Sequence, residues 1–192
     1  MDLYFKKEII YPFQGEKFKF DVANTLFSTF EMDHGTDVLL RALLPSNPRT
    51  ILDLGCGYGP IGIILAKKNP QAEVTMLDVN LLAVHYAKIN IEKNNVKNAV
   101  VIGSVAMEQV IDKTFDLILS NIPAKIGDEA ITQDFILTPY KHLNPGGELW
   151  IVVINALNRL IPGIGRKNKL NMNEIKKRSG HTVYRIKKPI NQ

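Results

Sequence analysis

The sequence has almost no cysteine and no long apolar segment. Cys56 is the single cysteine in 192 residues, so no internal disulfide and no cysteine-based zinc site can form. The four histidines are scattered without neighbours at metal-ligand spacing, and no metal is expected. No apolar run approaches the roughly 20 residues that cross a bilayer, and the first residues lack the apolar core and cleavage site of a signal peptide. These absences predict a soluble, cytoplasmic protein without membrane contact.

Acidic residues are scarce at the C-terminal end of the chain. The net charge is +5, but residues 159–188 hold ten basic groups against Glu174 alone, which gives +9 for this segment. The other residues hold 14 basic and 18 acidic groups, which gives −4. A nearly neutral body with one strongly basic end favours a polyanionic partner such as nucleic acid over a merely solvated lysine-rich end.

From Arg49 onward, segments typical of buried strands alternate with segments typical of helices. Strands are predicted at 50–54, 74–77, 99–102, 115–119 and 148–154, and helices at 61–68, 81–94 and 129–143. This alternation indicates a parallel sheet with right-handed crossovers. Paired strands are predicted within residues 4–30, a short helix at 36–44 and a hairpin at 175–186 that turns at Ser179 and Gly180.

The sequence therefore predicts an α/β fold, a doubly wound, seven-stranded mixed sheet with an antiparallel C-terminal hairpin and an N-terminal strand extension. We expect one domain over residues 1–192, with 1–35 as the extension and 36–192 as the catalytic core. Residues 162–169 contain two glycines and three cations, and we expect them to form a flexible basic loop near the substrate edge.

Residues 51–59 are the most informative segment. An apolar run ends in Asp53, the glycines Gly55, Gly57 and Gly59 follow at two-residue spacing, and a helix with proline in its first turn comes next. Glycine permits a positive φ in a tight turn and lets the backbone lie against a ligand without a Cβ in the way. A strand, a glycine turn and a helix in this order predict a nucleotide-binding turn.

Two cofactors compete for this turn. Residues 57–62 match G-x-G-x-x-G, which taken alone suggests NAD. Two features disfavour NAD. Asp53 precedes the glycines, where an acid suits a cationic amine better than a pyrophosphate. Asn121 at the end of a later strand has no use in a dehydrogenase. Asp78 follows the turn by about 20 residues, the spacing at which an acid accepts hydrogen bonds from ribose. S-adenosylmethionine (SAM), with an ammonium group and a ribose but no phosphate, is favoured.

The glycine turn, Asp78, residues 33–36 and residues 121–124 together resemble class I SAM-dependent methyltransferases, and in particular the small-methyltransferase-domain family. The resemblance covers roughly residues 20–188. Val105 stands where such enzymes often have an acid, so adenine would be read by backbone groups and apolar contact. The cofactor-binding positions that the resemblance implies are Gly35, Thr36, Asp53, Gly55, Gly57, Gly59, Asp78, Asn80, Ser104, Val105 and Asn121.

The resemblance also implies an acceptor site at Asn121, Ile122 and Pro123, which would hold an exocyclic amine facing the SAM methyl group. The family usually has Asn-Pro-Pro followed by a bulky residue, whereas this chain has Ile122 and Ala124. Alanine cannot stack on a base, so Phe27 or Tyr58 would have to supply a ring. The expected substrate contacts are Phe27, Lys125, Arg166, Lys167 and Lys169.

Three functions remain open. The favoured function is N-methylation of RNA, at guanine N2 of ribosomal RNA or of a ribosomal subunit, as the resemblance implies. A glutamine side chain of a protein also presents a planar NH2 group and is an alternative acceptor, although the basic tail disfavours it. The third function is a SAM-binding, RNA-associated module without catalysis, which Ile122 and Ala124 suggest.

Overall fold

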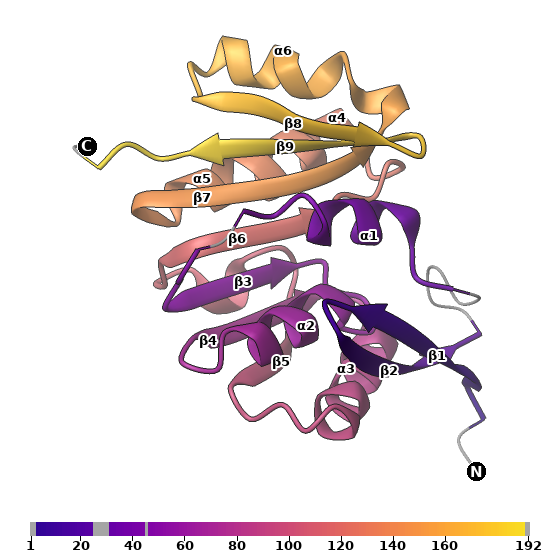
Figure 1. Cartoon of the computed structure of the whole chain (residues 1–192). Coiled ribbons are helices and arrows are strands. Elements are labelled where there is room, and N and C mark those ends of the chain that lie inside the picture. Colours follow the sequence, from indigo (N-terminus) through magenta and orange to yellow (C-terminus); the bar gives the residue numbers. More distant parts are fainter. Residues whose placement is uncertain (1–2, 25–30, 45, 191–192) are drawn as a thin grey trace.

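The structure, a computed structural model, describes residues 3–24, 31–44 and 46–190. Its central element is a seven-stranded sheet in the spatial order β5-β4-β3-β6-β7-β9-β8 (Figure 1). The first five strands are parallel, and β9 runs antiparallel to β7 and β8. In that order the strands span Ala99–Gly103, Glu73–Asp78, Thr50–Leu54, Phe115–Asn121, Leu143–Ile154, His181–Lys187 and Met172–Arg178. This sheet confirms the predicted fold class.

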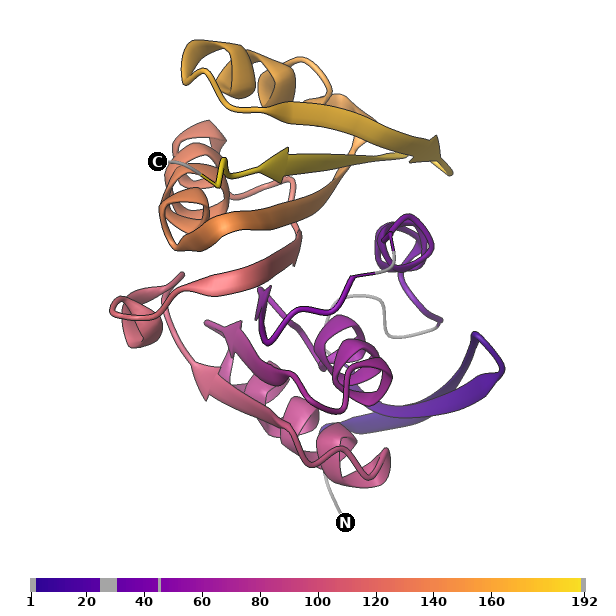
Figure 2. The ribbon, with the colours of Figure 1, turned by 60° about the vertical axis from the view of Figure 1, so that its left-hand side comes forward.

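Helices cover both faces of the sheet, and each layer packs on its own hydrophobic cluster (Figure 2). One face carries α1 (His34–Leu40), α2 (Pro60–Lys68) and α3 (Leu81–Lys93). The other carries α4 (Asp128–Thr132), η2 (Gln133–Leu137), α5 (Thr138–Lys141) and α6 (Leu160–Lys167), with the short turns η1 (Glu108–Val110) and η3 (Asn155–Leu157). Because both faces are covered, residues 51–54 of β3 are all buried, which explains why they are apolar apart from Asp53.

The N-terminal extension is a separate two-stranded ribbon of β1 (Phe5–Phe13) and β2 (Glu16–Ala23). Gln14 and Gly15 between the strands both have positive φ, as a two-residue hairpin turn requires. The ribbon contributes Phe18 and Phe20 to the cluster around α2 and α3. The predicted paired strands are therefore confirmed for residues 5–23.

The helix predicted at 129–143 is present, but it is not α-helical throughout and it ends two residues early. The chain forms α4, the π-helical segment η2 and then α5 without interruption, and β7 already begins at Leu143. Pro139 has no N–H to donate to the carbonyl four residues earlier, so the α-helical hydrogen bonds cannot continue unchanged. The π-helical segment precedes this proline.

The flexible basic loop predicted at 162–169 is wrong. Residues 160–167 form helix α6, whose Ile161 and Ile164 are buried in the hydrophobic cluster on the face that carries α4 and α5. We call this cluster the second cluster. Pro162 is tolerated because it lies in the first turn, where its missing N–H leaves no hydrogen bond unmade. Within the described part of the chain, no helix is long and apolar enough to span a membrane.

Candidate active site

The candidate site lies at the carboxyl ends of the parallel strands. β3 is flanked by β4 on one side and by β6 on the other, so the strand order reverses between β3 and β6. Ligands of open α/β sheets bind in the crevice beyond such a reversal. The residues at these strand ends therefore decide what the site can hold.

The glycine turn after β3 leaves its backbone open at one end and packed at the other. Gly55, Gly57 and Gly59 have φ of +74°, +58° and +93°, a region that favours glycine. A Cβ on Gly57 would meet nothing within 4 Å, whereas one on Gly59 would lie 2.9 Å from Ile63 Cδ1. Gly57 thus offers a surface for close approach of a ligand, and Gly59 serves the packing of α2.

Asp53 is fully buried directly beneath this turn. Its Oδ2 accepts a hydrogen bond from Gly62 N at 2.8 Å, while its Oδ1 has no partner. Burial raises the pKa of Asp53 to about 7, against the Gly62 hydrogen bond and with a further contribution from the Asp78 charge. A buried carboxylate oxygen without a donor fits a cofactor that brings a cationic ammonium group, directly or through water.

Asp78 joins the end of β4 to the glycine turn. Its Oδ2 accepts from Gly57 N and its Oδ1 from Asn80 N, both at 2.8 Å. Asn80 Oδ1 in turn caps α3 by accepting from Leu82 N at 3.0 Å. Each carboxylate oxygen retains a free lone pair. The ribose role of Asp78 and the cofactor role of Asn80 therefore stay predictions, since the carboxylate also has a structural task.

Apolar side chains stand exposed beside the ends of β4 and β5. Val79, Leu81 and Val105 are 68%, 73% and 56% exposed. Such side chains can hold a flat heterocycle between them, as expected where an acid is absent. The hydroxyl of Ser104 is already engaged, because it donates to Ala106 O at 3.0 Å and accepts from Gln109 N at 3.3 Å.

Asn121, the last residue of β6, is held in one orientation by the start of α1. Its Nδ2 donates to Asp33 Oδ1 at 2.6 Å and to Thr36 Oγ1 at 3.1 Å, and the same Asp33 oxygen accepts from Thr36 N at 2.9 Å. An ionised carboxylate only accepts, so the amide nitrogen must face Asp33. The Asn121 Oδ1 therefore points away from Asp33 as a fixed acceptor.

Ile122 and Gly35 complete the surroundings of Asn121. The Ile122 side chain is buried in the second hydrophobic cluster and its N–H donates to Val152 O at 3.0 Å. A Cβ on Gly35 would lie 3.0 Å from Asp33 Oδ1, 3.0 Å from His181 Cδ2 and 3.2 Å from Asn121 Nδ2. Isoleucine thus replaces the usual proline as a core residue, and only glycine leaves room for this cluster.

Sequence reasoning gave no role to Asp33 or His181, although both lie in the Asn121 cluster. Asp33 could have been found from its position three residues before Thr36, since Asp is a common helix N-cap. His181 begins β9, and its ring comes to Gly35 only through the pairing of β9 with β7. No local signal could have indicated it.

The predicted substrate residues are not brought together. Lys125 is exposed just beyond Pro123, and Phe27 lies outside the described residues. Tyr58 cannot supply a stacking ring, because it is 3% exposed and packs edge-on against Phe20. Burial also raises the pKa of the Cys56 thiol well above its usual range, as suits a packing residue.

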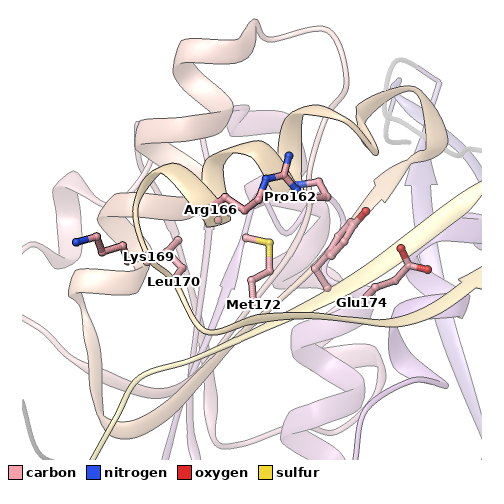
Figure 3. A pocket seen from close by; sticks show the side chains of 8 residues that line it. Pro162, Arg166, Lys169, Leu170, Met172 and Glu174 are labelled. Carbon is pink, nitrogen blue, oxygen red and sulfur yellow. The ribbon is translucent and has the colours of Figure 1, made fainter.

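Arg166 and Lys169 lie beside β8, with β7 and β9 between them and β6, on the face of the sheet that carries α4 and α5. α6 starts after the carboxyl end of β7 and leads to Met172, which pairs with Ile186, the partner of Leu149 in the middle of β7. The structure does not bring these cations and Lys167 next to Asn121, and their contact with the substrate stays a prediction. Figure 3 shows Arg166 and Lys169 at a separate pocket of about 440 Å³, which is lined by Pro162, Gly165, Arg166, Lys169, Leu170, Met172, Glu174 and Tyr184.

Comparisons with known proteins identify the family. The model of the family "Methyltransferase small domain" matches residues 17–185. Ribosomal RNA small subunit methyltransferase C of Haemophilus influenzae is 37% identical over 137 residues, which cover 69% of this chain and 40% of the relative. The uncharacterized protein YbxB of Bacillus subtilis is 35% identical over 142 residues, 73% of this chain and 70% of that protein.

A solved structure has the same fold. The T. thermophilus 16S rRNA N2 G1207 methyltransferase, in complex with AdoMet and guanosine, superposes with a TM-score of 0.82 at 24% identity, over 96% of this chain and 51% of that one. The chain spans about 40% of the length of the small subunit methyltransferase C relatives that it matches. The chain belongs to the methyltransferase small domain family, which confirms the predicted resemblance. SAM, the predicted cofactor, is the methyl donor of this family. No group of histidine, cysteine, aspartate and glutamate side chains that could hold a metal ion occurs among the described residues.

Proposed function

We propose that this chain transfers a methyl group from SAM to the exocyclic N2 amine of a guanine in ribosomal RNA. The observation that carries the proposal is the fixed orientation of Asn121, whose Oδ1 is aimed away from Asp33 and Thr36. SAM, when bound, supplies an electrophilic methyl group on a sulfonium. The names of the relatives, and the guanosine bound to the T. thermophilus enzyme, support ribosomal RNA and guanine as acceptor.

The Asn121 amide acts on the amine by positioning. An aromatic amine has its lone pair delocalised into the ring, and acceptors on its N–H groups turn the nitrogen toward the methyl carbon. As the C–N bond formed, the bond from the methyl carbon to sulfur would break and S-adenosylhomocysteine would leave. The partial negative charge of Asn121 Oδ1 would stabilise the positive nitrogen, which would then lose one proton to water. Asp33 holds the amide without needing to reorganise during the reaction.

The donor end would be held by residues around the glycine turn. Asp53 would meet the ammonium group of SAM through its unpartnered Oδ1 or a bridging water. The open backbone at Gly57 and the Asp78 carboxylate would border the ribose side. Val79, Leu81 and Val105 would cover the adenine.

A labelling experiment tests the acceptor. We would incubate the protein with isotopically labelled SAM and ribosomal subunits, free ribosomal RNA and total protein from a strain that lacks it, and identify the labelled residue by mass spectrometry. Label in N2-methylguanosine is expected. Label in glutamine would replace RNA by protein as the substrate, and the absence of label in every fraction would leave a binding module.

Two substitutions test the amine clamp. Asn121→Ala should lower kcat by about 10²- to 10³-fold, as for the loss of a preorganised catalytic hydrogen-bond partner, with the Kd for SAM nearly unchanged by calorimetry. Asp33→Asn keeps a good N-cap for α1 but no longer forces the orientation of Asn121, so kcat should fall while the melting temperature stays constant. Full activity of Asn121→Ala with normal SAM affinity would exclude the clamp.

A further inference from the structure

The C-terminal hairpin places four cations on one face of the sheet. The side chain of Val183 in β9 lies in the cluster under α1, and alternation along the strand puts Arg185 and Lys187 on the same face. On β8 the register shift between Glu174 and Lys176 brings Lys176 opposite Val183. Arg178, which pairs with His181, also lies on this face. We call Lys176, Arg178, Arg185 and Lys187 the basic strip.

The basic strip is largely uncompensated. Glu148 is the acid beside it, with carboxylate oxygens 3.8 Å from Arg185 Nη1 and 3.8 Å from Lys187 Nζ. Asp37 of α1, whose charge also interacts with Arg178, is paired with Arg41 at 2.7 Å. Lys176 Nζ donates to the carbonyl oxygen of Arg41 at 3.4 Å. The strip and Arg41 together give five cations against the two acids Glu148 and Asp37, a net +3 for these groups.

The basic strip leads directly to the candidate site. Arg178 pairs with His181, whose ring lies against Gly35 beside Asn121 and Asp33. From that end the strip runs along β8 and β9 toward Lys187, six residues or roughly 20 Å farther along the strand. In Figure 1, β8 and β9 lie above α1 in the view, and no described helix is drawn in front of them.

The cations of α6 have a different relation to the site. Arg166, Lys167 and Lys169 are exposed at the edge of the sheet beside β8, on the side of the second cluster. A strand of RNA whose base reaches Asn121 would have to pass around β8 to contact them. The basic charge of residues 159–188 is therefore divided between two surfaces, of which one borders the site.

We propose that the basic strip is the docking surface for the RNA strand next to the target nucleotide, and that the cations of α6 are not. This inference rests on the proposed function for its partner. The strand would be single at this point, because a base that presents its exocyclic amine to Asn121 has left its pair. Lysine and arginine in a row bind such a strand through its phosphates.

Matched triple variants test the docking surface. One variant carries Lys176→Gln, Arg178→Gln and Lys187→Gln, and its control carries Arg166→Gln, Lys167→Gln and Lys169→Gln. Arg185 is left in place because it stacks over Trp150 and its Nε is buried. Both variants lose three charges from a helix or strand surface, so general charge effects are equal.

The measurement is the affinity for a short, fluorescein-labelled single-stranded RNA at several salt concentrations. The strip variant should bind at least tenfold more weakly, and its slope of log K against log salt should be shallower by about 2, as three lost phosphate contacts imply. The control variant should bind like the wild type, and both variants should keep the wild-type affinity for SAM.

The outcomes separate this inference from the proposed function. A larger loss in the α6 variant, equal losses in both, or salt-insensitive binding by the wild type would overturn the docking surface, even if guanine is methylated. A selective loss in the strip variant would support the surface even if the labelling experiment found no methyl transfer to RNA.

Discussion

At the scale of single residues, Asp53 is a buried carboxyl group whose protonation we expect to be linked to SAM binding. The carboxyl group is fully buried, and its pKa lies near 7 because burial penalises the charge. Since this pKa is raised above the ordinary value of 3.8, the native state retains a proton that the unfolded chain loses. Below about pH 4 the carboxyl group is protonated in both states, and the free energy of unfolding has its full value. The free energy of unfolding then falls as the pH rises to about 7, and above that pH it is lower by on the order of 4 kcal/mol.

A cationic ligand should offset the free-energy cost of ionising the buried Asp53 carboxyl group. We predict that SAM binds more tightly as the pH rises from about 5 to about 7, by up to about tenfold per unit, and that binding near pH 6 releases about one proton. Calorimetry in buffers of different ionisation enthalpy measures both quantities. The Asp53→Asn variant, which cannot ionise, should bind weakly and without this pH dependence. An equal dependence in the variant would assign the proton to another group.

The residues that sequence reasoning found are those next to a strand end or in a glycine motif. Asp53 and Asp78 follow apolar residues directly, Asn121 follows an apolar run and Ser120, and parallel strands bring their ends to one edge. Asp33 and His181 were not given roles, because the contact of Asp33 with Asn121 of β6 and that of His181 with Gly35 of α1 join residues far apart in sequence. Contacts of that kind depend on tertiary structure.

At the scale of elements, α2 lies so close to the sheet that any side chain at Gly62 would press against Met76. A Cβ on Gly62 would be 2.2 Å from Met76 Sδ and 3.1 Å from Asp53 Oδ2. The Gly62 N–H can approach Asp53 only because no side chain intervenes. The strand, turn and helix of the glycine motif are thus locked together by this residue as well as by the glycines of the turn.

We predict that Gly62→Ala lowers the free energy of unfolding by about 1–3 kcal/mol, the usual cost of overpacking a core. Gly163→Ala is the matched control, since the same change in α6 meets nothing within 4 Å. There the better helix propensity of alanine should stabilise by up to about 1 kcal/mol. Urea unfolding measures both variants. A Gly62→Ala protein as stable as the wild type would show that Met76 moves aside without cost.

The elements themselves were largely predictable, with informative exceptions. β3, α2, β4 and α3 have strong apolar patterns and punctuation by glycine and asparagine, and they occur close to their expected bounds. Helix α6 was missed because Pro162 and two glycines suggest a loop, while Ile161 and Ile164 stabilise the helix only through burial. Tertiary packing overrode local propensity there.

At the scale of the whole molecule, Asn90 of α3 connects the N-terminal ribbon to the glycine turn. Its Oδ1 accepts from Asp21 N at 2.7 Å, and its Nδ2 donates to Asp21 O at 3.0 Å and to Tyr58 O at 2.9 Å. Asn94, one turn later, makes the same pair of bonds to Lys19 at 3.0 and 2.7 Å but does not reach the glycine turn. The ribbon is thus coupled to the candidate SAM site by the hydrogen bonds of Asn90, in addition to the ring contact of Phe20 with Tyr58.

The two asparagines allow that coupling to be measured. Asn90→Ala and Asn94→Ala each remove the bonds to β2 and should each lower the free energy of unfolding by roughly 1–3 kcal/mol, more at the buried Asn90. Only Asn90→Ala also frees the Tyr58 carbonyl, so only that variant should raise the Kd for SAM, by about tenfold if the turn loses about 1.4 kcal/mol of preorganisation. Equal SAM affinities in the two variants, by calorimetry at a temperature where both are folded, would mean that the ribbon stabilises the fold without acting on the site.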